Sequence, residues 1–339
     1  MAHGYGQRDE AVLNAPRSPR IGYRPAPDGA ASLLGANTLA AFGFGEDRKN
    51  LPDDPRWLEV PLRPLDASAL YEVWEVGGPV RHGRDSAVRW SRGGGWLFAA
   101  IEVDERAFDN DLDGAAEHAY AELCRVLSMH EERHVQRIWN YLGDINRGDG
   151  DEERYKRFCH GRARGMGTFF ADGYPAATAI GHHATQGLLQ VYLLATDRPG
   201  QRVENPRQVS AWQYPRQYGL TPPSFARATL LPARDVLAIS GTAAVVGHAS
   251  AHHDDRDAQL EETLLNLGTL LASAGMTGPF GPGSPLKAYV RHAKDAERVR
   301  RFAQARLPSV PLMILHGDIC RHELLVEIDG WAYANGDHA

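Results

Sequence analysis

QLEETLLNLGTLLASAG, residues 259–275, is the most strongly patterned segment of the 339-residue chain. Leu260, Leu264, Leu267 and Leu271 recur at the i, i+4, i+7, i+11 spacing that is typical of an amphipathic helix. Gly275 follows where a helix C-cap is expected. The segment therefore predicts a helix that buries one leucine-rich face.

The same spacing recurs in the N-terminal half, which predicts an internal repeat. Each helix precedes a β-type run, a second helix and two further strands, so the order β-α-β-α-β-β occurs twice. The first copy has its helix at Ala116, Tyr120, Leu123 and Leu127 and its runs at 137–142, 176–180 and 188–194, and the second has runs at 286–290, 311–315 and 324–328.

This order predicts an α+β protein in which helices pack on one face of mixed β-sheets. Residues 1–50 are rich in Gly, Pro and Ala and are interpreted as an irregular N-terminal arm. We expect an N-terminal domain over 51–205 and a C-terminal domain over 206–339.

Charge and cysteine content limit the classes of partner. The formal net charge of −6 provides no basic field for nucleic acid or an anionic membrane, so a small molecule is expected. Cys124, Cys159 and Cys320 are an odd number of cysteines, which favours a reducing cytoplasm over a secreted disulfide framework. The sequence contains no apolar segment that predicts an export signal or a membrane span.

Residues from Ile239 to Trp331 resemble a reactive-intermediate deaminase (RidA-like) module. Further segments resemble the chorismatase family, which is built on this module, so the resemblance implies two tandem RidA-like (chorismate-mutase-like) modules. The matching segments are residues 239–242, 259–275 and 326–329 for the module, and 137–146, 154–158, 161–165, 211–219 and 240–248 for the family.

This resemblance implies a pyruvate-releasing lyase of secondary metabolism that needs no metal or organic cofactor. Its substrate would be chorismate and its products 3-hydroxybenzoate and pyruvate, with 4-hydroxybenzoate as a second product in some members. A chorismate hydrolase that forms 3,4-dihydroxycyclohexa-1,5-diene carboxylate is the alternative within the family.

Glu327 is the candidate general acid. Alternation along a strand places Val326 and Ile328 on one face and Glu327 and Asp329 on the other. A glutamate among branched apolar residues is poorly solvated, which raises its pKa and suits it to protonate the methylene of an enolpyruvyl ether. The residues alone favour a carboxylate at the rim of a half-exposed strand. The resemblance reverses this preference and gives Glu327 the catalytic role.

Cys320 lies in the loop Gly317 to His322. An intracellular cysteine is usually a small buried hydrophobic residue. The resemblance instead implies that a cysteine here marks the 3-hydroxybenzoate-forming branch, in which it assists the opening and aromatisation of a ring oxide. That branch favours a glycine in the pocket wall, where this chain has Ala243 and Ala244.

Two carboxylates on chorismate require cationic anchors, and arginine is suited because its planar fork bonds a carboxylate bidentately. Surface ion pairing is the ordinary role of such arginines. By resemblance and helical spacing, the substrate-binding candidates are Tyr155, Arg157, Arg162, Tyr214, Arg216, Arg227 and Ala244.

Other classes remain open. The adjacent pair His182 and His183 suggests a metal site, but neighbouring residues of a strand face opposite sides of the sheet. The sequence also has no HExxH or CxxC spacing, so no metal site is predicted. A RidA-like imine deaminase is disfavoured because residues 307–318 contain no arginine, the nearest being Arg321. A small-molecule-binding protein is the non-enzymatic alternative, and a monomer or small homo-oligomer is expected.

Overall fold

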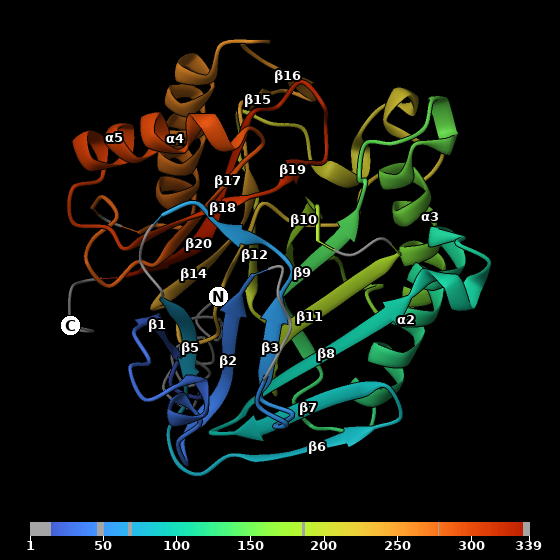
Figure 1. The fold of residues 1–339 in the computed structure, drawn as a ribbon, viewed down its shortest axis with the longest axis vertical. Helices are drawn as coiled ribbons and strands as arrows, with labels where there is room; N and C mark the ends of the chain where they lie inside the picture. The colour runs from blue at the N-terminus through green and yellow to red at the C-terminus, as the bar shows by residue number, and fades with distance from the viewer. Residues whose placement is uncertain (1–14, 46–50, 67–69, 185–186, 277, 335–339) are drawn as a thin grey trace, which may run out of the picture.

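The computed structural model describes residues 15–45, 51–66, 70–184, 187–276 and 278–334. In these residues one four-stranded and two seven-stranded sheets form the body of the molecule, and helices cover the outer sides (Figure 1). The four-stranded sheet has the order β1 (Arg20–Arg24), β5 (Tyr71–Glu75), β2 (Thr38–Phe44) and β3 (Trp57–Val60).

The two seven-stranded sheets have equivalent strand orders. The first runs β6 (Arg81–Asp85), β7 (Val88–Gly93), β8 (Trp96–Asp104), β11 (Leu188–Thr196), β9 (His134–Gly143), β10 (Ala176–His182) and β19 (Asp318–Ile319). The second runs β12 (Gln201–Val203), β13 (Ala228–Leu230), β14 (Val236–Thr242), β20 (Val326–Tyr333), β17 (Leu286–Val290), β18 (Leu312–His316) and β4 (Arg63–Pro64).

In both sheets a parallel pair, β9 with β10 and β17 with β18, lies beside antiparallel strands. The helices α2 (Leu112–Leu127) and α3 (Arg154–Met166) cover the first sheet, and α4 (Arg256–Ser273) and α5 (Ala296–Arg306) cover the second. The predicted α+β class, with mixed sheets and helices on one face, is confirmed. Figure 1 shows the two helix pairs on opposite sides of the molecule.

Helices α2 and α4 begin where short acidic side chains cap them. Asp111 accepts hydrogen bonds from two backbone N–H groups at the start of α2, and Asp255 accepts one from Ala258 N (3.0 Å) at the start of α4. Gly161 and Gly165 in α3 lie against backbone oxygens of α2, where a Cβ would overlap. The two helices therefore pack closely because those two positions lack side chains.

Two predictions about domain organisation need correction. Residues 20–24 and 38–44 are strands β1 and β2 and are not an irregular arm, because they pair with β5 and β3. β12 lies before the expected boundary at 205/206 but pairs with β13 of the second sheet. The two halves also exchange edge strands, since β4 pairs with β18 and β19 pairs with β10.

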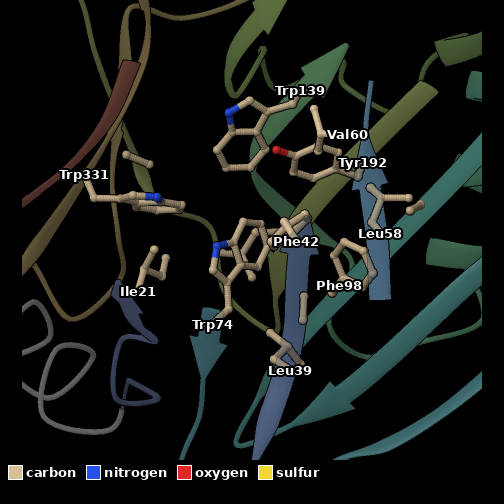
Figure 2. Packing of buried hydrophobic residues seen from close by; sticks show 14 of the residues in the cluster. Ile21, Leu39, Phe42, Leu58, Val60, Trp74, Phe98, Trp139, Tyr192 and Trp331 are labelled. Atoms are coloured by element: carbon tan, nitrogen blue, oxygen red, sulfur yellow. The ribbon is translucent and has the colours of Figure 1, made fainter. Parts of the chain in front are cut away.

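An aromatic core joins the three sheets (Figure 2). Trp74 of β5, Trp139 of β9 and Trp331 of β20 have ring centroids 5.4–6.0 Å apart. These side chains lie on the faces turned away from the helices, whereas Val326 and Ile328 pack with α4 and α5. The core therefore holds the inner faces of β9 and β20 together, and the inner face of β20 contributes to the site described below.

Candidate active site

A cavity of about 310 Å³ lies between the two halves of the chain, a size within the usual range for small-molecule sites. The beginning of α3 forms one wall, and segments of the second half form the others. Its lining residues are Glu153, Tyr155, Lys156, Gln208, Tyr214, Gln217, Tyr218, Pro223, Phe225, Arg227, Gly241, Ala243, Val245, Cys320, Arg321, His322, Glu323, Leu324 and Glu327.

Glu327 lies in the cavity wall and is 5% exposed. It is on the inner face of β20, as the strand alternation predicts, and among the described residues no group is hydrogen-bonded to its carboxyl. Burial, and next the nearby charge of Asp329, raise its pKa to about 8, although Arg137, Arg227 and Arg321 act in the opposite direction. Glu327 is therefore mostly protonated at neutral pH.

Two guanidinium groups line the same cavity. Arg227 Nη2 donates to Val209 O (2.8 Å) and to the Tyr214 hydroxyl (2.6 Å), while its buried Nε has no hydrogen-bond partner. Arg321 stacks on the Tyr218 ring at 4.1 Å, and its Nη1 donates to His248 O (2.8 Å). In the part of the chain that the structure describes, neither arginine has a carboxylate partner within ion-pair distance. Both can therefore receive an anionic ligand.

Cys320 and Tyr155 come to the cavity from different halves. β19 crosses to the edge of the first sheet, where Ile319 pairs with Ile180, and this crossing brings Cys320 toward α3. Burial, and next the proximity of Glu327, raise the pKa of the Cys320 thiol well above its usual range. Burial likewise raises the pKa of Tyr155. Both groups are neutral hydrogen-bond donors at neutral pH.

Arg157 and Arg216 are predicted from the sequence to bind substrate, but neither residue lines the cavity. Arg157 is ion-paired with Asp111 (2.8 Å), and Arg216 makes a bidentate pair with Asp151 (2.8 and 2.6 Å). The turn that follows Pro215 points Arg216 outward and brings Tyr218 to the cavity. These two arginines have the ordinary role of surface ion pairing.

Arg162 and Ala244 are also absent from the cavity lining. Arg162 is buried over the Tyr120 ring at 5.2 Å, and its Nε and Nη2 have no hydrogen-bond partners in the described chain. Ala244 is fully buried, while Gly241 and Ala243 of the same segment line the cavity. The cavity wall therefore contains a glycine, which is Gly241, whereas the sequence comparison placed Ala243 and Ala244 at the glycine position of the family.

Sequence reasoning missed Arg321 as a cavity residue, because it was considered only as a deaminase clamp. Its place directly after Cys320 is the signal that could have identified it. Arg137 was also missed, although an arginine in the apolar strand pattern before Ile138 and Trp139 indicates a buried ion pair. Its partner is Asp329 (3.0 Å), and both side chains are fully buried.

No group of three or more His, Cys, Asp or Glu side chains in the described chain is arranged to hold a metal ion. None of its helices is both long and apolar enough to cross a membrane.

Comparisons with known proteins agree with one another. A family model described as "Chorismatase FkbO/Hyg5-like, N-terminal" matches residues 72–195. A chorismatase from Streptomyces hygroscopicus is 34% identical over 90% of this chain and 91% of that protein. A 3-hydroxybenzoate synthase from the same organism is 35% identical over 80% of this chain and 84% of that protein. The crystal structure of a chorismatase has a TM-score of 0.81 at 32% identity and covers 93% of this chain and 98% of that one.

Proposed function

The chain belongs to the chorismatase family, and on that premise we propose that it cleaves chorismate into 3-hydroxybenzoate and pyruvate. The observation that carries the proposal is the Glu327 carboxyl, which faces the cavity without a hydrogen-bond partner among the described residues and has a pKa of about 8. It is therefore available as a proton donor at neutral pH.

The first step is protonation of the enolpyruvyl arm. The Glu327 carboxyl gives its proton to the terminal methylene carbon, and the electron pair of the C=C bond forms the new C–H bond. Positive charge then develops at the carbon that bears the ether oxygen. This charge weakens the bond between the ether oxygen and the ring, so pyruvate leaves with that oxygen.

The second step closes and opens a ring oxide. The neighbouring ring hydroxyl oxygen forms a bond to the carbon that pyruvate leaves, and its proton returns to the Glu327 carboxylate. The Cys320 thiol, which its raised pKa keeps protonated, donates its proton to the oxide oxygen as the ring opens. Loss of a ring proton, which restores the thiol, gives the aromatic product without added water.

Arg227 and Arg321 are the anchors that we propose for the two carboxylates of chorismate. They take the place of Arg157 and Arg216, whose guanidinium groups are neutralised by Asp111 and Asp151. Tyr155 and Tyr214 add hydroxyl groups to the same cavity. A doubly negative substrate is thus matched by two arginines that have no carboxylate partner in the described chain.

We also infer that each half is a RidA-like module and that the four-stranded sheet is an addition to them. The equivalent strand orders of the two large sheets support this inference. The residues proposed for the reaction, Glu327, Cys320, Arg227 and Arg321, line one cavity of a single chain, and we propose a monomer or a small homo-oligomer. The three cysteines are free thiols, which is consistent with a cytoplasmic enzyme.

Incubation with chorismate, followed by chromatography, mass spectrometry and NMR, tests the function. We expect pyruvate and 3-hydroxybenzoate in equal amounts, and NMR would identify any accompanying 4-hydroxybenzoate. Release of the dihydroxycyclohexadiene acid alone would assign the hydrolytic branch. Chorismate that remains intact, or full activity of Glu327→Gln, would refute the proposal.

A further inference from the structure

Asp329 is a buried carboxylate that the proposed reaction does not use. It lies two residues after Glu327 on the same face of β20 and is fully buried. One of its oxygens, Oδ2, accepts four hydrogen bonds. The donors are Arg137 Nη2 (3.0 Å), Trp139 Nε1 (2.9 Å), Thr178 Oγ1 (2.7 Å) and the Tyr289 hydroxyl (3.0 Å). All four stabilise negative charge on Asp329.

Thr178 of β10 connects Asp329 to the cavity wall. Its hydroxyl donates to Asp329 and accepts hydrogen bonds from Arg137 Nη2 and from the backbone N–H of Gly241 (2.9 Å). One donor and two acceptor positions are all that a hydroxyl offers, so its hydrogen-bonding capacity is fully used. The position of Gly241 is therefore tied to Asp329 through a single side chain.

The absence of a side chain at Gly241 in turn leaves the space that the Glu327 carboxyl occupies. The ladder between β14 and β20 shifts register between Ile239 and Thr242, so Gly241 lies in an irregular part of the strand. A Cβ at this position would overlap the Glu327 carboxyl. Any displacement of the Gly241 backbone would thus change the orientation of that carboxyl.

We propose that Asp329 and Thr178 are positioning residues for Glu327: through the hydrogen bond to Gly241 they hold the strand that shapes the space of the Glu327 carboxyl. The inference rests on the proposed function, because it concerns the acid of that reaction. Neither Asp329 nor Thr178 lines the cavity, so each acts through another residue.

The charge of Asp329 adds an electrostatic consequence. Asp329 raises the pKa of Glu327 and also forms the buried ion pair with Arg137, whose positive charge lowers that pKa. Removing the negative charge would leave Arg137 unbalanced, so Glu327 would lose its proton at a lower pH. The charged and titratable groups around Glu327 are Asp329, Arg137, Arg227, Arg291, Cys320 and Arg321.

The first experiment measures kcat/KM against pH for the full chain and for Asp329→Asn. The wild-type profile should fall above a pKa near 8, and the variant should show this fall at a pH lower by about one unit. Glu72→Gln is the control, because Glu72 is also a buried carboxylate in an ion pair, with Lys287 at 2.8 Å. It should lower stability without moving the profile. An unmoved profile in folded Asp329→Asn would overturn the electrostatic part of the inference.

The second experiment uses Thr178→Val and Thr178→Ser. These variants test the positioning role even if Asp329→Asn does not fold. Valine keeps the shape but breaks the link to Gly241, so kcat should fall roughly 10- to 100-fold while KM changes less than about twofold. Serine restores the hydroxyl and should recover most of kcat. Equal kcat in wild type and Thr178→Val, or no recovery in the serine variant, would reject the positioning role.

The inference can fail while the proposed function holds. Wild-type turnover of chorismate that is lost in Glu327→Gln, together with unaltered behaviour of the Asp329 and Thr178 variants, would refute the inference alone. Absence of chorismate turnover in the wild type would refute the proposed function itself.

Discussion

Gly241 and Glu327 face each other so closely that a Cβ on residue 241 would overlap the carboxyl of Glu327. The glycine is required by space and not by backbone conformation, since it is not among the glycines with positive φ. The proposed acid therefore depends on a neighbour in β14 that contributes no side chain to the cavity.

Gly241→Ala is expected to lower kcat/KM roughly 10- to 100-fold, because the added methyl group displaces the proposed acid. The cost in unfolding free energy should be small, because the overlapped atoms belong to the end of the Glu327 side chain, which can move aside. Gly268→Ala in α4 is the matched control, since its Cβ would enter open space and should stabilise by about 0.5–1 kcal/mol. Steady-state kinetics and urea denaturation measure both, and normal activity of Gly241→Ala would contradict the close approach.

Replacement of the proposed anchors should weaken substrate binding. Arg227→Gln and Arg321→Gln each remove a charge-assisted hydrogen bond to a carboxylate, which is worth about 1.5–3 kcal/mol. Arg216→Gln is the control, because that arginine is 61% exposed and paired with Asp151, and its KM should stay within about twofold of wild type. A large rise in KM for Arg216→Gln alone would mean that the anchors are misassigned.

Cys320→Ala should shift the product from 3-hydroxybenzoate toward the dihydroxycyclohexadiene acid, since no thiol then assists aromatisation. Cys320→Ser retains a neutral donor and should keep more of the aromatic product. Cys124→Ala, which alters a thiol on α2 outside the cavity, serves as the control. Product ratios by chromatography and NMR that do not change in Cys320→Ala would remove this role.

Glu327 should make the stability of the protein depend on pH. Its pKa is about 8 in the folded protein and near the ordinary 4.5 in the unfolded chain, so the folded state binds more protons between these values. The stabilisation is full below pH 4.5 and is lost as the pH rises through about 8. Between pH 5 and pH 9 the wild type should therefore lose about 2–4 kcal/mol more than Glu327→Gln. Parallel urea-denaturation curves for the two proteins would contradict a raised pKa.

Periodic patterns predicted the local structure well. The leucine spacing at 260–271 predicted α4, and alternation along β20 placed Val326 and Ile328 on the helix side and Glu327 on the other. The matching segments also indicated the family. These features could be predicted because each depends on neighbouring residues and on which face of an element is apolar.

Pairing between segments that are distant in the sequence decided the N-terminal strands and the availability of the arginines. Residues 20–24 and 38–44 carry little periodic signal and become strands because β5 and β3 lie beside them. The sequence favours Arg216 as an anchor because Pro215 fixes the backbone before it. Asp151, 65 residues away, neutralises Arg216, whereas Arg227 faces the cavity. The sequence alone determined the helices, the strand faces and the family. Only the tertiary structure decided which cations remain available to a ligand, because a charge is neutralised by whichever carboxylate the fold brings within a few ångströms of it.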